Sequence, residues 1–253
     1  MPSPRPFQDH FSAGSSDYAA FRPRYPETLF RWVASQSPGR DLAWDCATGN
    51  GQAAVGLAPL YTRVVATDAS SAQLAMAEPR ANIDYRCASA EASGLADLSV
   101  DVVTVAQALH WFDRPAFFAE VIRVAKPGAL LAVWTYNLIR GGAALDHVVD
   151  RLYGDVLGRY WPADRALVET GYRDVAIPFA ELTTPPFEMS AQWTLAQLKG
   201  YLRTWSSAVR YQAQHGVDPL LSVADELAAA WGDPSQVRDL RWPLAVRAAR
   251  VER

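Results

Sequence analysis

The first half of the chain alternates between short apolar runs and segments with helical periodicity. The strand-like runs cover 41–46, 63–68, 82–87, 99–107 and 128–136, and the helical segments cover 27–35, 51–60, 70–79 and 114–126. This alternation predicts parallel strands that are joined by right-handed helical crossovers. The runs VVTVA and ALLAVW are apolar, as expected for strands that are covered on both faces.

The second half of the chain begins with longer amphipathic segments. Residues 144–160 and 194–209 each place their apolar side chains on one helical stripe. Thr194 and Gln197 have the spacing of a capping box, in which each side chain satisfies a backbone N–H of the first helical turn. Two amphipathic helices are therefore expected here.

Further strands are predicted between and after these helices. Residues 179–190 have strand character, but Pro185 and Pro186 would end that strand or confine it to a sheet edge. The tail 241–252 alternates in a way that favours a final strand.

Composition restricts the classes of protein to which the chain can belong. It has 253 residues, half of them hydrophobic, and its 24 basic and 27 acidic residues give a net charge of -3 without a dense Lys/Arg block. A sequence-independent grip on nucleic acid is therefore not expected. The first residues lack an apolar signal core, and no apolar run approaches the roughly twenty residues that span a bilayer. We expect a cytoplasmic protein that does not bind membranes.

The chain has two cysteines, Cys46 and Cys87, which lie 41 residues apart within apolar runs. This is neither a paired motif nor a metal-ligand spacing, so buried free thiols and no metal site are expected.

The sequence DCATGNG, from Asp45 to Gly51, carries the clearest chemical signal. It follows the first predicted strand and opens the next helix. Gly49 and Gly51 allow a tight backbone turn and a close approach to a ligand, which the first N–H groups of the helix would face. Asp68 ends the next predicted strand, where a carboxylate can accept hydrogen bonds from both ribose hydroxyls of an adenosine group.

This pattern alone leaves two cofactor classes open. Gly49, Gly51 and Ala54 also satisfy the relaxed fingerprint for nicotinamide dinucleotides. Asp45, however, lies four residues before Gly49, where its charge would repel a pyrophosphate but suits a ligand with an ammonium group. S-adenosylmethionine carries that ammonium group and a sulfonium.

Residues 41–136 resemble the class I S-adenosylmethionine-dependent methyltransferases of the type 11 superfamily. The resemblance rests on D-x-x-x-G-x-G, Asp68 and the segments 88–103 and 106–113, which follow one another in the family's order. Two shorter motifs, YAAFRPRYP and ALHWFD, are similar to the trans-aconitate methyltransferase-like group within it.

The resemblance implies a doubly wound, Rossmann-like α/β fold. Its sheet would have seven mostly parallel strands, with a helical insertion after strand five. The expected parts are an N-terminal arm and lid helix (1–38), a cofactor-binding core (39–139), a helical cap with one strand (140–235) and a C-terminal strand (236–253).

The resemblance also implies cofactor-binding residues. The methionine half would be held by Asp45, Ala47, Gly49 and Gly51. Asp68 would hold the ribose, and Ala69 and Leu74 would cover one face of the adenine. The adenine edge would meet Ala90, Glu91 and Ser89, of which Ser89 stands where the family usually has an aspartate. Gln107 would lie beside the transferred methyl. The lid would comprise Tyr18, Arg22 and Tyr25, with the Arg22 guanidinium meeting the cofactor carboxylate.

The acceptor side is less defined by the sequence. His110 is a candidate general base, but a packed or cofactor-lining histidine is favoured because a carboxylate acceptor needs no base. Aromatic residues that could line a substrate pocket or belong to the core are Trp111, Trp134, Tyr136, Tyr201 and Trp205. Candidate cations for an anionic acceptor are Arg22, Arg140 and Arg203.

The expected activity is methyl transfer to a small molecule by a monomer or homodimer, and the narrower resemblance implies an organic acid carboxylate as the acceptor. Two alternatives remain open at this stage: a nicotinamide-dependent oxidoreductase, and a non-catalytic protein that binds S-adenosylmethionine.

Overall fold

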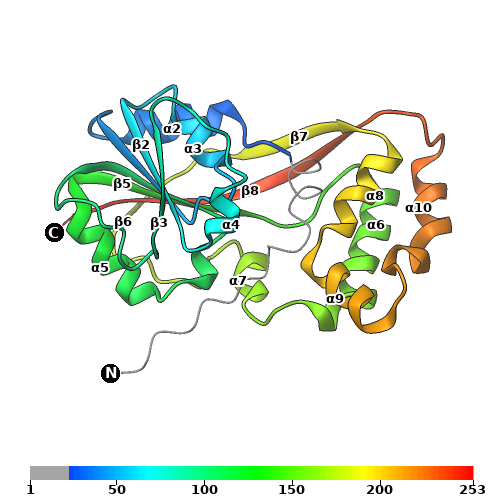
Figure 1. Cartoon of the computed structure of the whole chain (residues 1–253). Coiled ribbons are helices and arrows are strands. Elements are labelled where there is room, and N and C mark those ends of the chain that lie inside the picture. The colour runs from blue at the N-terminus through cyan, green and yellow to red at the C-terminus, as the bar shows by residue number, and fades with distance from the viewer. Residues whose placement is uncertain (1–22, 253) are drawn as a thin grey trace.

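A twisted, mostly parallel sheet forms the centre of the computed structural model, which describes residues 23–252 (Figure 1). The strands of this part of the chain are β1 (Leu42–Cys46), β2 (Arg63–Asp68), β3 (Ile83–Cys87), β4 (Val100–Ala106), β5 (Ala125–Tyr136), β6 (Ala180–Leu182), β7 (Phe187–Trp193) and β8 (Arg238–Arg250). Their order in the sheet is β3-β2-β1-β4-β5-β8-β6. β6 pairs with the last residues of β8, and β7 pairs with the first half of β8.

The described helices surround this sheet or project beyond it. The α-helices are α2 (Glu27–Gln36), α3 (Gln52–Leu57), α4 (Ser71–Leu74), α5 (Arg114–Val124), α6 (Ala143–Arg151), α7 (Arg165–Glu169), α8 (Leu195–Arg203), α9 (Ser206–His215) and α10 (Ala224–Trp231). Shorter 3-10 and π segments are η1 (Leu109–Trp111), η2 (Leu152–Val156), η3 (Gly158–Tyr160) and η4 (Pro219–Val223).

The first five strands confirm the predicted parallel sheet. β1 pairs in parallel with β2 and β4, β2 pairs with β3, and β4 pairs with β5. The carboxyl ends of these strands therefore lie along one edge, where ligands of open α/β sheets bind. The segments after β1, β2, β4 and β5 all contribute side chains to this edge.

The predicted effect of the two prolines is also observed. Strand β6 ends at Leu182 and β7 begins at Phe187, so Pro185 and Pro186 separate two pieces of one interrupted edge strand. Both pieces run antiparallel to the 13-residue strand β8, which also pairs with β5. β7 and the first half of β8 therefore form a two-stranded antiparallel ribbon that leads out of the sheet.

The helices of the second half form a cap in two parts. Helices α6 and α7 follow β5, whereas α8, α9 and α10 lie between β7 and β8 (Figure 1). The expected insertion after strand five is thus divided, because β6 and β7 run through it. The capping box of Thr194 and Gln197 is present at the start of α8.

Three hydrophobic clusters hold these layers together. One packs α2 and α3 onto one face of the sheet, and a second packs α5 onto the other face. The third joins the cap helices to the outer part of β7 and β8 through Leu198, Trp193 and Trp242. The cap therefore has a core of its own.

The cysteine prediction is only half correct. Cys46 is buried in β1, but Cys87 is exposed, because it ends β3 at the edge of the sheet. Within the described residues, the helices are all too short or too polar to cross a lipid bilayer.

Candidate active site

The loop after β1 is shaped by positive φ angles at Ala47 (54°), Gly49 (57°) and Gly51 (86°). Glycine is most strongly required at position 51, because a Cβ there would lie 2.5 Å from Tyr85 Oη. Such φ values are costly for residues with a side chain. The loop conformation therefore depends on the two glycines that the sequence pattern singled out.

Asp45 lies beneath this loop and is fully buried. The Thr48 hydroxyl donates to Oδ2 at 2.5 Å, and the Thr104 hydroxyl donates to Oδ1 at 2.8 Å. Burial raises the pKa of Asp45 to about 6, although these hydroxyls and the Ala54 N–H lower it. The carboxyl group thus fixes the loop from inside, and its charge is held close to the ligand-binding edge.

Asp68 ends β2 and contacts the glycine loop directly. Its Oδ2 accepts from Gly49 N and its Oδ1 accepts from Ser70 N, both at 2.8 Å. Asp68 does not cap the helix that follows it. Helix α4 is capped by Ser70, whose side chain accepts from Gln73 N. The hydrogen bonds from Gly49 N and Ser70 N hold the Asp68 carboxylate at the end of β2, beside the glycine loop.

The predicted adenine residues come from two segments on this edge. Ala69 is exposed and Leu74 is half-buried at α4, while Ala90 is buried after β3. Ser89 is exposed and forms an isolated bridge with Ala92. A further contact links the Glu91 carboxylate to Asp113 N at 3.1 Å.

Gln107, directly after β4, is strained and tightly held. Its φ is 57°, its Nε2 donates to Tyr136 O at 2.9 Å, and its Oε1 accepts from the Thr135 hydroxyl. The side-chain amide is therefore fixed against the end of β5.

His110 is buried next to the cap, and its Nδ1 lies 2.9 Å from Tyr172 Oη. Burial, together with the nearby charge of Arg165, lowers the pKa of His110 to about 3. The imidazole is thus neutral at physiological pH. Tyr172 follows α7, is fully buried and has a φ of 61°; burial raises the pKa of its phenol, while the Thr135 hydroxyl lowers it.

Most of the candidate aromatic residues lie in the core, where Tyr25 packs against Trp134 and Tyr136, and Tyr201 packs against Trp205. Trp134 is fully buried between the sheet and α2, with Tyr25 edge-on at 5.5 Å between ring centroids. Tyr136 is buried at the end of β5, and Tyr201 and Trp205 are buried in the cap cluster. Trp111 is exposed beside His110.

The candidate cations are separated as well. Arg140 forms an ion pair with Asp150 at 2.8 Å, and Arg203 forms one with Asp218 at 2.8 Å. The remaining two lid predictions, Tyr18 and Arg22, lie outside the described residues.

Sequence reasoning missed Arg165, the first residue of α7. Its Nη2 donates to Asn137 Oδ1 at 2.9 Å and its Nε donates to Tyr153 Oη at 3.1 Å. Asn137 follows the last residue of β5, so this contact spans from the cap to the sheet edge. No local pattern marks Arg165, because its partners are 12 and 28 positions away.

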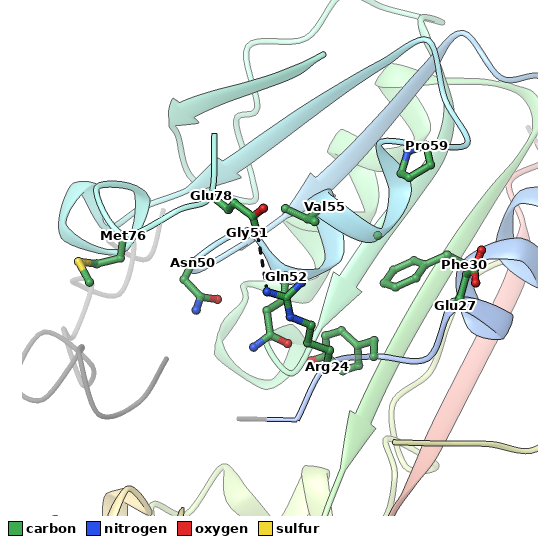
Figure 2. A pocket seen from close by; sticks show the side chains of 12 residues that line it. Arg24, Glu27, Phe30, Asn50, Gly51, Gln52, Val55, Pro59, Met76 and Glu78 are labelled. Atoms are coloured by element: carbon green, nitrogen blue, oxygen red, sulfur yellow. Dashed lines mark ion pairs between the residues drawn. The ribbon is translucent and has the colours of Figure 1, made fainter. Parts of the chain in front are cut away.

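Two cavities of similar size adjoin this edge. The first, about 390 Å³, is lined by Gly51 and Tyr25 and by the ion pair of Arg24 with Glu78 at 3.8 Å (Figure 2). The second, about 370 Å³, lies between β5, β8 and the loop after α7. Tyr136 lines this second cavity.

The chain is similar to known methyltransferases. Residues 44–133 match a methyltransferase domain family. A Dictyostelium discoideum protein described as a methyltransferase is 31% identical over 96% of this chain and 95% of its own. A Saccharomyces cerevisiae protein described as an S-adenosylmethionine-dependent methyltransferase is 24% identical over 92% of this chain and 91% of its own.

A solved structure described as a type II methyltransferase, from Anaeromyxobacter dehalogenans, is 46% identical. It covers 92% of this chain and 99% of its own, with a TM-score of 0.88. The fold and the edge of strand ends define an α/β nucleoside-binding protein. The chain belongs to the class I S-adenosylmethionine-dependent methyltransferases, and S-adenosylmethionine is its methyl donor.

Proposed function

We propose that this methyltransferase transfers the methyl group to a small organic acid or a similarly compact polar metabolite, and not to nucleic acid or protein. The observation that carries the proposal is the contact of the cap with the ligand-binding edge. Tyr172 meets His110, and Arg165 meets Asn137, each at 2.9 Å. An acceptor between the cap and the strand ends would be enclosed, which suits a small molecule better than a polymer.

The residues along the edge fit the cofactor. Asp68, which ends β2 beside the glycine loop, would accept hydrogen bonds from the ribose hydroxyls. The bare backbone at Gly49 and Gly51 would admit the methionine half, and the buried charge of Asp45 would favour its ammonium group. Ala69 and Leu74 would cover the adenine.

Bound S-adenosylmethionine supplies an electrophilic methyl on a sulfonium, and the transfer is an in-line displacement. The protein's part is then to align the acceptor with the methyl and to exclude water. Gln107, fixed by Thr135 and Tyr136, would line the space beside the methyl. His110 would be a weak base because its pKa is lowered to about 3, and it would contribute mainly a polar surface. This suits a carboxylate acceptor, which needs no base.

The shorter motifs YAAFRPRYP and ALHWFD support membership of the trans-aconitate methyltransferase-like group, whose acceptor is a small organic acid. The excess of acidic over basic residues also argues against a polymer with a phosphate backbone. Both observations favour the same acceptor class.

The test has two parts. Calorimetry should show binding of adenosylhomocysteine and none of NADH; the reverse result would refute the cofactor assignment. A screen of small carboxylates, small alcohols and amines, oligonucleotides and peptides for adenosylhomocysteine release should then give turnover with a carboxylate. Turnover only with oligonucleotides or peptides would refute the acceptor class.

A further inference from the structure

Arg165 differs from the other cations considered for the acceptor in having no carboxylate partner. Among residues 23–252 it forms no ion pair, whereas Arg140 and Arg203 are each paired with an aspartate. Its two hydrogen bonds go to neutral groups, the amide oxygen of Asn137 and the phenol of Tyr153. The Tyr153 hydroxyl in turn donates to Glu169, which lies four residues after Arg165 on α7 but forms no ion pair with it.

The guanidinium is held in place before any ligand binds. Its Cζ lies 4.6 Å from the ring centroid of Trp161 and 5.6 Å from that of Tyr153. Stacking on two rings restrains the side chain, so little conformational entropy is lost when it binds an anion. Two of the five N–H donors of an arginine are used here, which leaves donors for a bidentate contact.

The position of Arg165 places this charge at the proposed acceptor space. Asn137 follows β5 and His110 follows β4, so both lie at the carboxyl edge of the sheet. Arg165 donates a hydrogen bond to Asn137, and its charge contributes to the low pKa of His110. Helix α7 accordingly lies between the sheet and the remaining cap helices (Figure 1).

We infer that Arg165 is the specificity-determining residue of the acceptor site and binds a carboxylate group of the acceptor. This inference rests on the proposed function. A carboxylate held bidentately by a guanidinium has its lone pairs engaged and is a poor nucleophile. The carboxylate bound by Arg165 is therefore an anchor, and the methyl goes to a second carboxylate of the same molecule.

The experiment measures probe binding by saturation-transfer NMR with adenosylhomocysteine present. The probes are benzoate and butanedioate, their neutral amides benzamide and butanediamide, and inorganic phosphate. The proteins are wild type, Arg165→Gln, Arg165→Lys and the control Arg151→Gln. Arg151 pairs with Glu226 on the cap surface, so its replacement removes an equal charge away from the site.

We expect wild type and Arg151→Gln to bind at least one of the two carboxylates and neither of the amides. Arg165→Gln should bind that carboxylate at least tenfold more weakly than wild type does. Arg165→Lys should retain an intermediate affinity, because an ammonium keeps the charge but loses the bidentate geometry. All four proteins should fold and should have the same affinity for adenosylhomocysteine. The two Arg165 variants should melt at a lower temperature than wild type, because they lose contacts between the cap and the sheet edge.

Three results would overturn the inference: no carboxylate binding to wild type, equal binding to Arg165→Gln, or equal binding of the amides. Preference for phosphate over both carboxylates would also overturn it in favour of a phosphorylated acceptor. Each leaves adenosylhomocysteine binding intact. Absence of adenosylhomocysteine binding to wild type would instead refute the proposed function.

Discussion

The buried carboxyl group of Asp45 should reduce the stability of the folded protein at neutral pH. It is fully buried, and burial raises its pKa from 3.8 to about 6. The folded protein therefore holds this proton more tightly than the unfolded chain does, and ionisation opposes folding. The hydrogen bonds from Thr48 and Thr104 offset only part of the lost hydration.

The magnitude follows from the pKa difference. One pKa unit corresponds to about 1.36 kcal/mol, so the ionised carboxyl costs about 3 kcal/mol of folding free energy above pH 6. The cost falls as the pH decreases from 6 and is absent below about pH 4. An asparagine at position 45 keeps an acceptor oxygen and does not ionise. Asp45→Asn should therefore be more stable than wild type at pH 8, by up to about 3 kcal/mol, and not at pH 4.

Urea unfolding of the protein without cofactor, at pH 4, 6 and 8, measures this difference. The matched control is Asp101→Asn, because Asp101 is also buried but pairs with Lys126 at 2.9 Å and accepts from two backbone N–H groups. Losing that charge should destabilise the protein at pH 8. If Asp45→Asn were less stable than wild type at pH 8, or if its advantage did not change with pH, the reasoning would be refuted.

Three other predictions concern the same edge of the sheet. Asp68→Asn should weaken cofactor binding by about tenfold or more, since hydrogen bonds to a charged group contribute about 1.5–3 kcal/mol; calorimetry with unchanged affinity in a folded variant would contradict this. Gly51→Ala should lower the melting temperature, because of the φ of 86° and the 2.5 Å approach to Tyr85 Oη, and Tyr85→Phe in the same protein should recover part of the loss. His110→Ala should retain most turnover and should leave the shape of the pH profile between pH 6 and 8 as in wild type, because the pKa of His110 is about 3; a loss of several orders of magnitude would favour a hydroxyl or amine acceptor that His110 deprotonates.

The parallel sheet could be predicted from the sequence because its determinants are local. Apolar runs such as Val100–Ala106 reveal strands that are buried on both faces, and Pro185 with Pro186 explains the break between β6 and β7. The glycine loop and Asp68 could also be recognised in the sequence, because the backbone conformation of the loop requires glycine and the carboxylate stands at the end of a predicted strand. The number of strands came from the resemblance, and the order of the strands was not predicted, because it depends on contacts between distant segments.

The acceptor side could not be predicted in the same way. Tyr172 reaches His110 across 62 positions, and Arg165 reaches Asn137 across 28. The candidate aromatics Tyr201 and Trp205 have helical spacing, which a pocket and a hydrophobic core share, and the structure buries them in the cap core. The candidate arginines could not be ranked without their ion-pair partners.

The residues of the cofactor-binding edge and those of the acceptor side lie in different parts of the chain. The family match covers 44–133, which includes the glycine loop, Asp68 and Gln107 but neither Arg165 nor Tyr172. A relative that shares only this region shares the cofactor-binding edge, and nothing in that match constrains its acceptor. The cap is held to the sheet by the pairing of β7 and β5 with β8 and by the contacts of Arg165 and Tyr172 with the edge. Relatives that align over nearly the whole chain, such as those from Dictyostelium discoideum and Anaeromyxobacter dehalogenans, are therefore the proteins in which the same acceptor class is expected.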